Sequence, residues 1–546
     1  MNKKTVFISV LCFALMVAIL SILHVILGFA KTPPGTVYLA TGHYYLDYYY
    51  YLQFVAQGLR GYWLPHQYSA IDDPSIYFQL EPYVLFGQLF RIFHLSPIIV
   101  YWLVVFLMTA VLTGLIFLVI RTWLKDRSLY LQFSALIISL TMVPFFSISR
   151  SPAGINVNTY DYWASNATFF NRFGPVPHHL LGQILAITVI LLFARFIELA
   201  NKTSFNKTII WSLFLTVITS FTLTFYPFLI VILISGFIFT FLFFSIKYWQ
   251  DKNLKSWLKL MIFLGIIIAG VGITGLLIKY YYYQTIFFND SKGVEASWSQ
   301  KVPLKLFFLN LGPAVILALF GLFKFFRKIS PIAIILLFFF MSSFSLFYSS
   351  VNYWLDTHNA RFLSPINYIF IGTLAALGMD QISSFFKKFK KNVFILLFTL
   401  FILISLPPNI QAFVNILKDK NLDSPITYLP KGIIDGFNFL DSLPGKEAVL
   451  MTPSQFLGTI LPAFTDRHTY VARPAATPNF IVKNITASNF YLGVISQAQA
   501  ADFLDKNGLK FVLLTSIEGY EITPLLQYPF LEEIYRNKNI VIFKVK

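Results

Sequence analysis

Long apolar runs recur along the first three-quarters of this 546-residue chain and constrain its fold more than any other feature. Many of them approach the roughly 20 residues that a membrane-spanning helix requires. The chain is 57% hydrophobic and only 12% charged, and a soluble chain can hardly bury so much apolar surface. We therefore predict a mainly α-helical, polytopic membrane protein with about eleven transmembrane helices. They are expected near residues 5–30, 98–123, 129–148, 177–199, 208–226, 227–247, 258–280, 309–326, 331–350, 362–382 and 392–407.

The first apolar run has two interpretations. It ends in "ILGFA", and a small residue in that place is typical of a cleaved signal peptide. The apolar stretch is longer than the core of such a peptide, so an uncleaved transmembrane helix is favoured. The one cysteine of the chain, Cys12, falls in this run, and neither an internal disulfide nor a cysteine-based metal site is expected.

Lysine and arginine clusters alternate with the expected helices and predict the orientation of the chain. All of them fall on one side of the membrane, which the positive-inside rule identifies as the cytoplasm. The N-terminus is then cytoplasmic, the net charge of +18 is a topology signal, and no nucleic-acid partner is expected. The clusters are Lys3/Lys4, Lys125/Arg127, Lys202/Lys207, Lys247/Lys252/Lys255/Lys259, Lys324/Arg327/Lys328 and the run at 387–391. The extracytoplasmic loops are expected at 31–97, 149–176, 281–308 and 351–361.

The region from residue 408 to residue 546 has a different character. Three short apolar runs bounded by turn residues predict buried strands. They lie at 447–453, 510–516 and 539–545. Residues 496–508 predict an amphipathic helix that ends at Gly508. We expect a transmembrane domain at 1–407 and a small extracytoplasmic α/β domain at 408–546, which supports acceptor or complex binding without carrying the catalytic groups.

The stretch "TGHYYLDYYYY" (41–51) places Asp47 among six tyrosines just after the first apolar run. In a helix, His43, Asp47 and Tyr51 would share one face. A carboxylate that aromatic rings shield from water gains basicity and suits a general base. Tyrosines such as Tyr48 and Tyr51 offer flat faces and hydroxyls to a sugar, although a tyrosine belt at a membrane interface explains them equally well. An acid near lipid is costly, which favours a functional role for Asp47.

The remaining acids of the first outer loop are ambiguous. Asp72 and Asp73 precede a proline, a pattern typical of a turn or helix cap. Together with Glu81 they could instead supply oxygen ligands to a metal ion. The turn is the favoured interpretation, so no cofactor is expected, while a divalent metal remains an open alternative.

The second outer loop holds another acid and a histidine pair. Asp161 again lies among aromatic residues, and Arg172 precedes "PVPHHLL", where proline opens the next helix. His178 and His179 therefore fall at a helix N-terminus, where unpaired N–H groups and the helix dipole favour an anion such as a phosphate. Interfacial filler and a fragment of a metal site are the alternatives for the histidines.

The third outer element, "YWLDTHNARFLSP" (353–365), brings Asp356, His358 and Arg361 close to the next expected helix. The guanidinium of Arg361 has the fork geometry that suits two-pronged phosphate recognition. The alternative is an interfacial arginine paired with Asp356.

Together these pieces resemble the GT-C superfamily of polytopic glycosyltransferases, which use lipid-phosphate-linked sugars. Asp47 in "YYLDYYYY" matches the first acidic motif of the family, and Asp161 in "NTYDYW" matches the second. "ARFLSPINYIF" is similar to the arginine-containing stretch before a late helix of bacterial members. "LPAFTDRHTYVARPAATPNFIVKN" (461–484) is similar to segments of their outer domains.

The resemblance implies a hexosyl- or pentosyltransferase that acts on the outer face of the membrane. Its donor would be a polyprenyl-phosphate-linked sugar, and its acceptor a glycan, lipid or protein. Asp47 would act as general base in an inverting reaction, and arginine and histidine groups would stabilise the leaving phosphate. A transporter or flippase for lipid-linked glycans and a non-catalytic envelope assembly protein are the alternatives.

Overall fold

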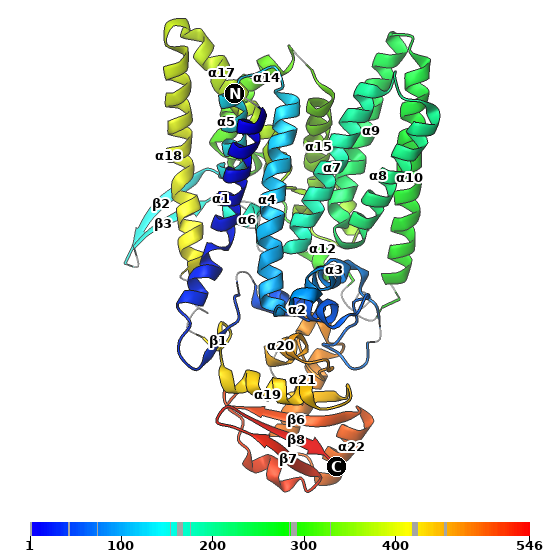
Figure 1. The fold of residues 1–546 in the computed structure, drawn as a ribbon, viewed down its shortest axis with the longest axis vertical. Coiled ribbons are helices and arrows are strands. Elements are labelled where there is room, and N and C mark those ends of the chain that lie inside the picture. Colours follow the sequence, from blue (N-terminus) through cyan, green and yellow to red (C-terminus); the bar gives the residue numbers. More distant parts are fainter. Residues whose placement is uncertain are drawn as a thin grey trace. The chain divides into compact units, whose positions relative to one another are not determined.

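The computed structural model describes residues 3–41, 44–73, 75–152, 154–160, 168–174, 176–282, 284–285, 292–327, 329–417, 424–451 and 456–546 (Figure 1). Contacts within the chain group its residues into two compact units. The first unit holds Met1–Ser21, Val105–Lys279 and Lys292–Asn415. The second unit holds Ile22–Val104, Tyr280–Ser291 and Ile416–Lys546.

Long apolar helices dominate the first unit (Figure 1). Among the described residues of the chain, seven helices are long and apolar enough to cross a membrane, or up to eight if a bent pair is one span. The seven are α1 (Lys3–Ala30), α4 (Pro97–Trp123), α7 (Pro177–Leu199), α8 (Phe205–Phe225), α9 (Pro227–Gln250), α10 (Leu254–Tyr282) and α18 (Lys390–Leu417). The predicted multi-pass membrane protein is thereby confirmed.

Shorter or bent helices coincide with the other expected spans. They are α5 (Leu129–Thr141), α13 (Leu304–Leu311), α14 (Pro313–Phe325), α15 (Pro331–Phe347) and α17 (Asn367–Phe385). The bent pair consists of α13 and α14, which meet at an angle of 87°. Gly312 between them has a φ of 69°, a conformation that favours glycine, and Pro313 opens α14. The single helix expected at 309–326 is therefore broken at this point.

The helix expected at 129–148 is shorter than predicted. α5 ends before Pro144, which lacks the backbone N–H needed to continue a helix. The chain then forms an antiparallel hairpin of β2 (Phe146–Ser151) and β3 (Gly154–Thr159). The apolar residues around Pro144 had extended the helical pattern in the sequence beyond its true end.

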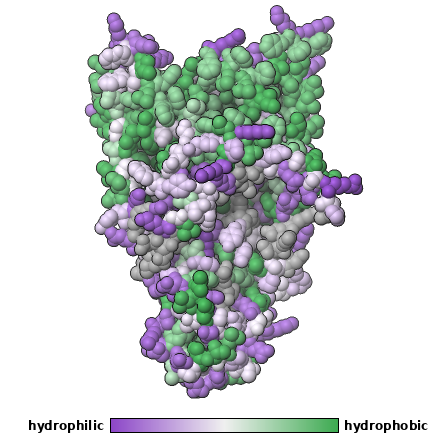
Figure 2. All heavy atoms as spheres, turned by 180° about the vertical axis from the view of Figure 1, so that it is seen from behind, coloured by the Kyte–Doolittle hydropathy of each residue, from purple (hydrophilic) through white to green (hydrophobic). Residues whose placement is uncertain are grey.

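Small residues allow α14 and α17 to pack closely in the first unit. A Cβ added to Gly321 would lie 2.0 Å from the Leu374 carbonyl oxygen, and one added to Gly378 would lie 1.8 Å from that of Leu317. Glycines in this arrangement let two helix backbones touch, as is common in membrane bundles. Figure 2 shows one face of the molecule, where hydrophobic residues cover much of the helical part of the chain.

The second unit joins the first outer loop to the C-terminal region. From the loop come β1 (Thr36–Tyr38), α2 (Tyr45–Arg60) and α3 (Glu81–Phe90), and β1 pairs with β4 (Tyr428–Pro430). The remaining elements are α19 (Lys431–Ser442), β5 (Ala448–Met451), α20 (Leu457–Phe464), α21 (Phe480–Tyr491), α22 (Gln497–Lys506), β6 (Leu509–Thr515), β7 (Leu531–Arg536) and β8 (Ile540–Val545).

A four-stranded sheet organises the C-terminal part of this unit. Its strand order is β5-β6-β8-β7, with β5 and β6 parallel and the other pairs antiparallel. The three predicted strands correspond to β5, β6 and β8, and the predicted amphipathic helix corresponds to α22, which confirms the α/β character. No strand was predicted at the position of β7. The domain boundary near residue 408 stays a prediction.

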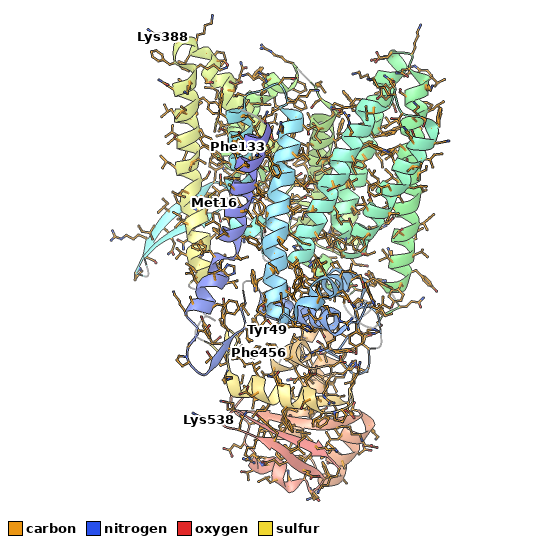
Figure 3. All side chains as sticks on the ribbon, in the orientation of Figure 1. Met16, Tyr49, Phe133, Lys388, Phe456 and Lys538 are labelled. Carbon is orange, nitrogen blue, oxygen red and sulfur yellow. The ribbon has the colours of Figure 1, made fainter. Side chains whose placement is uncertain are left out.

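α2 lies in the core of the second unit. Tyr49 is fully buried, and its ring lies 5.4 Å from that of Phe456 beside α20 (Figure 3). On the other side, Gly58 of α2 and Gly87 of α3 pack closely. A Cβ on Gly58 would lie 2.1 Å from the Val84 carbonyl oxygen. Elements from the outer loop and from the C-terminal region thus hold α2 rigidly in place.

Candidate functional site

Asp47 lies in the first turn of α2, where the helix dipole favours a negative charge. Its Oδ1 forms an ion pair with the Nη2 of Arg473, and the two side chains are 30% and 21% exposed. The carboxylate is therefore ion-paired and its side chain remains partly exposed. His43 lies outside the described residues, so the predicted face of His43, Asp47 and Tyr51 stays a prediction.

The tyrosines around Asp47 have two different environments. Tyr48 is fully buried, with its ring 4.9 Å from that of Tyr101, and burial raises its pKa well above the usual value. A ligand cannot reach this side chain in the structure, contrary to the expected substrate contact. Tyr51 is only partly buried and stacks flat on Tyr83 at 4.7 Å. Tyr51 therefore remains a candidate for sugar contact.

Asp72 and Asp73 of the first outer loop make contacts within the second unit. Asp73 is 2% exposed and accepts hydrogen bonds from the Ser75 N–H at 3.0 Å and from the Tyr77 hydroxyl. This is the turn that the Asp-Asp-Pro pattern favours. Asp72 forms an ion pair with Lys483 at 2.6 Å. Burial raises the pKa of Glu81 to about 7. Within the described parts of the chain, no group of three or more His, Cys, Asp or Glu residues could hold a metal ion.

Arg361 is held by a residue that the sequence analysis did not single out. It lies in a short 3-10 helix (Asn359–Phe362), and its Nε and Nη2 donate to the Oε1 of Glu295 at 2.9 and 2.5 Å. Glu295 comes from α12 (Val294–Ser297), in the outer loop expected at 281–308. The Thr357 hydroxyl donates to the second oxygen of Glu295 at 2.9 Å. A guanidinium and a carboxylate, both partly exposed, thus form an organised charged pair.

His358 joins this pair from beneath the surface. It is 1% exposed, and its Nε2 lies 3.5 Å from the Oε1 of Glu295. Burial, assisted by the Arg361 charge, lowers the pKa of His358 to about 4. The imidazole is therefore neutral at physiological pH and contributes shape instead of charge.

The two adjacent histidines reach the same group of residues through Tyr226. His178 and His179 lie in the first turn of α7, as predicted, and their rings are 4.3 Å apart. His179 stacks on Tyr226 at 5.0 Å. The start of α9, directly after Tyr226, contacts Arg361, whose guanidinium carbon lies 5.6 Å from the centre of the Phe228 ring. We name the set of His178, His179, Tyr226, Glu295, Thr357, His358 and Arg361 the Arg361 cluster.

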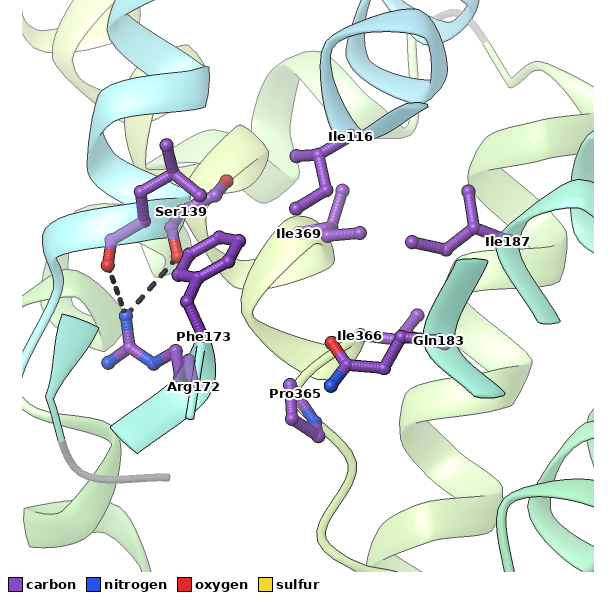
Figure 4. Close-up of a pocket in the computed structure, with 10 residues that line it drawn as sticks. Ile116, Ser139, Arg172, Phe173, Gln183, Ile187, Pro365, Ile366 and Ile369 are labelled. Atoms are coloured by element: carbon purple, nitrogen blue, oxygen red, sulfur yellow. Dashed lines mark hydrogen bonds between the residues drawn. The ribbon is translucent and has the colours of Figure 1, made fainter. Parts of the chain in front are cut away.

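Arg172 does not belong to this cluster. Its guanidinium is 4% exposed and donates to the carbonyls of Ser139 at 3.3 Å, Leu140 at 2.8 Å and Met142 (Figure 4). These carbonyls end α5, and the ring of Tyr368 lies 3.8 Å from the guanidinium carbon. Arginine is favourable at a helix C-terminus, where it satisfies the last carbonyls. The phosphate contact expected for Arg172 is replaced by a structural cap.

Arg172 also borders a small pocket in the first unit. Figure 4 shows it between residues of α4, α5, α7 and α17, with the side chains of Gln183 and Ile369 across from the arginine. Burial lowers the pKa of Arg172 to about 10, so the side chain keeps its charge at neutral pH. Asp161, the second expected acid, lies outside the described residues, and its role stays a prediction.

Neither a family model nor a curated protein matches this chain in sequence. Several solved structures match its fold. Arabinofuranosyltransferase AftD from Mycobacteria matches with a TM-score of 0.55 at 11% identity, over 100% of this chain and 40% of that chain. ArnT from Cupriavidus metallidurans bound to undecaprenyl phosphate matches with a TM-score of 0.51 at 12% identity. The match covers 100% of this chain and 98% of ArnT. Oligosaccharyltransferase AglB from Archaeoglobus fulgidus matches with a TM-score of 0.50 at 13% identity, in a structure that contains an inhibitory peptide and a dolichol-phosphate. The match covers 94% of this chain and 70% of AglB.

All three matched proteins are GT-C glycosyltransferases. The identities are low, so the matches establish the architecture of this chain and leave its chemistry to its own residues. The chain has the GT-C fold, as the acidic motifs in its outer loops predicted.

Proposed function

We propose that this protein is a membrane glycosyltransferase. It would transfer a hexosyl or pentosyl group from a polyprenyl-phosphate-linked donor to an extracytoplasmic glycan, lipid or protein acceptor. The observation that carries the proposal is the accessible, ion-paired carboxylate of Asp47 in the first outer loop of a GT-C fold. The undecaprenyl phosphate bound to ArnT and the dolichol-phosphate bound to AglB support a lipid-phosphate donor.

Asp47 would act as the general base. As the acceptor hydroxyl attacks the anomeric carbon, its proton passes to the Asp47 carboxylate and a new glycosidic bond forms. The bond between the anomeric carbon and the phosphate oxygen breaks at the same time, and its electron pair leaves with the lipid phosphate. Attack opposite to the leaving group inverts the anomeric configuration.

The Arg361 cluster is the candidate for the leaving phosphate. Negative charge grows on the phosphate in the transition state, and a fixed guanidinium stabilises it most where water is scarce. Arg361 is 31% exposed and held in one orientation by Glu295. His178 and His179 lie at the N-terminus of α7, where the helix dipole favours an anion.

The proposed orientation has a cytoplasmic N-terminus and an extracytoplasmic C-terminus. Two of the basic loops lie together, the one before α8 and the one before α10. The side-chain amide of Asn253 in the second loop donates a hydrogen bond to the Asn201 side-chain oxygen in the first at 2.6 Å. Asp380, near the end of α17, forms ion pairs with Lys324 and with Lys390. These ion pairs link two further basic loops. Basic loops that lie together in pairs favour the membrane side on which they lie as the cytoplasmic one. Reporter fusions after Lys546 that behave as cytoplasmic would contradict this orientation.

Transport of lipid-linked glycans is the second candidate. The break between α13 and α14 favours it, because broken helices mark the substrate sites of many transporters.

Proteoliposomes separate the two functions. The purified protein is supplied with a panel of polyprenyl-phosphate sugars or with the corresponding nucleotide sugars, and both donor cleavage and lipid translocation are followed. The proposal predicts polyprenyl phosphate release from the lipid-linked donor only, with transfer to an acceptor. Translocation without cleavage would assign the protein to the transporters instead.

A further inference from the structure

The stretch 468–483 of the C-terminal region is fastened to residues 68–72 of the first outer loop. Both stretches belong to the second unit. The contacts that join them include hydrogen bonds from the Thr469 N–H to the Tyr68 carbonyl at 2.9 Å and from the Thr477 hydroxyl to the Ser69 carbonyl at 3.3 Å, and the ion pair of Lys483 with Asp72 at 2.6 Å. The first of these contacts joins two backbone groups, and in the second a backbone carbonyl is the acceptor.

Arg473 is placed at the centre of this fastened stretch. Pro474 follows it and opens a short 3-10 helix, and the Ala476 N–H donates to the Arg473 carbonyl at 2.9 Å. The Thr477 hydroxyl accepts from the Ala472 N–H at 3.1 Å and closes the turn from the other side. The backbone of Arg473 is thus fixed before its side chain makes any contact.

The side chain of Arg473 reaches two residues of α2. Its Nη2 forms the ion pair with the Oδ1 of Asp47, and its guanidinium carbon lies 5.3 Å from the centre of the Tyr50 ring. Tyr50 is 5% exposed and accepts a hydrogen bond from Gln67 at 2.9 Å, so the ring is itself fixed. The guanidinium is therefore positioned both by its own backbone and by the ring that it contacts.

We propose that Arg473 is the positioning residue for Asp47, which makes the C-terminal region a working part of the reaction centre. The inference rests on the proposed role of Asp47 as general base. A guanidinium on Oδ1 sets the orientation of the carboxylate, and a carboxylate has enough acceptor positions to serve a second partner. Its permanent charge also favours the ionised form that a base requires.

This assignment differs from a purely structural bond in what it predicts for catalysis. A contact that only stabilises the fold changes the amount of folded protein and leaves the turnover of each folded molecule unchanged. A positioning contact changes kcat, because a base that is slightly misplaced loses rate although the substrate still binds.

The test compares Arg473→Gln, Arg473→Lys and the control Arg536→Gln in the full-length protein. Arg536 is a half-exposed arginine of the same region that pairs with Glu533 three residues earlier. We expect Arg473→Gln to lower kcat by about 10- to 100-fold with little change in the KM for the donor. Arg473→Lys keeps the charge and should recover most of the loss, and the control should match the wild type.

A thermal-unfolding cycle with Asp47→Asn, Arg473→Gln and the double variant tests the ion pair without using activity. The two changes should be non-additive if the pair exists in solution. Additive effects, a wild-type kcat in Arg473→Gln, or a loss that only follows the folded fraction would each overturn the inference. If the wild type transfers no sugar while the cycle shows coupling, the proposed function fails and the contact stands.

Discussion

Two arginine–carboxylate pairs lie in different units of this molecule, and their roles are reversed. In the second unit the carboxylate of Asp47 is the predicted reactive group, and Arg473 holds it. In the first unit the guanidinium of Arg361 is the predicted ligand-binding group, and Glu295 holds it. All four side chains are between 21% and 31% exposed, so a substrate can reach either pair.

Arg172 shows what a structural arginine looks like in the same molecule. It is 4% exposed and binds the backbone carbonyls at the end of α5. The difference teaches that charge at a membrane edge is not sufficient to identify a phosphate site. Partial exposure and an ionic partner that a ligand can replace separate Arg361 from Arg172.

The largest expected effect comes from Asp47→Asn. The amide keeps the size of the side chain but cannot accept the proton, so kcat should fall by about 10²–10⁴-fold. Protein amount and membrane insertion should be unchanged. Asp502→Asn, which alters an exposed pair with Lys506 on α22, is the control. A near-normal rate in Asp47→Asn would mean that the tyrosine-rich stretch is only a tyrosine belt at the membrane interface.

The second-largest loss of turnover is expected from Arg361→Lys. Lysine keeps the charge but loses the fork that binds two oxygens, so kcat should fall by about 10- to 100-fold, nearly as much as in Arg361→Ala. Arg195→Lys, in an exposed pair with Glu198, serves as the control. Full activity in Arg361→Lys would move the phosphate site away from the Arg361 cluster.

Glu295→Gln should strengthen the binding of polyprenyl phosphate, in contrast to the losses expected for the variants of Asp47 and Arg361. The carboxylate now neutralises Arg361, and a phosphate must compete with it. Removing that charge should tighten the binding of polyprenyl phosphate by a few fold, which corresponds to about 1 kcal/mol for a partly exposed pair. Titration with the lipid measures the change. Weaker binding would mean that Glu295 orients Arg361 without competing with the ligand.

The smallest effect on turnover is expected for His358→Gln. Burial lowers the pKa of His358 to about 4, against about 6.5 in an unfolded chain. Between these values the unfolded state binds more protons, so the contribution of His358 to stability falls as pH drops from 6.5 toward 4. Thermal unfolding from pH 4 to 8 should show less acid sensitivity in the variant, while kcat above pH 6.5 stays close to normal. A variant that retains the full acid sensitivity would contradict the lowered pKa.

Much of the fold could be predicted from the sequence because the bilayer leaves a strong signal. Each apolar run of sufficient length corresponds to a helix, and three of the four strands of the C-terminal sheet follow from short apolar runs bounded by turn residues. The errors occurred where an apolar run continues past its helix, as at Pro144, or where one residue breaks it, as at Gly312.

Only one residue of each arginine–carboxylate pair in the candidate site could be predicted from the sequence. Asp47 and Arg361 stand out because a charge near lipid is costly. Their partners Arg473 and Glu295 carry no such signal, since each lies in a polar segment where charges are ordinary. Arg473 occurs in a stretch with a family resemblance, and Glu295 is one of two acids between residues 281 and 308. Only the folded chain brings either residue to its partner.

The anomeric configuration of the transferred sugar tests the central claim most directly. A polyprenyl-phosphate sugar of known configuration is given to the purified protein, and the product is analysed by NMR together with the amount of polyprenyl phosphate released. The account predicts one released phosphate for each sugar transferred, with the configuration inverted. Retained configuration would contradict Asp47 as a general base, and an intact donor would contradict glycosyl transfer altogether.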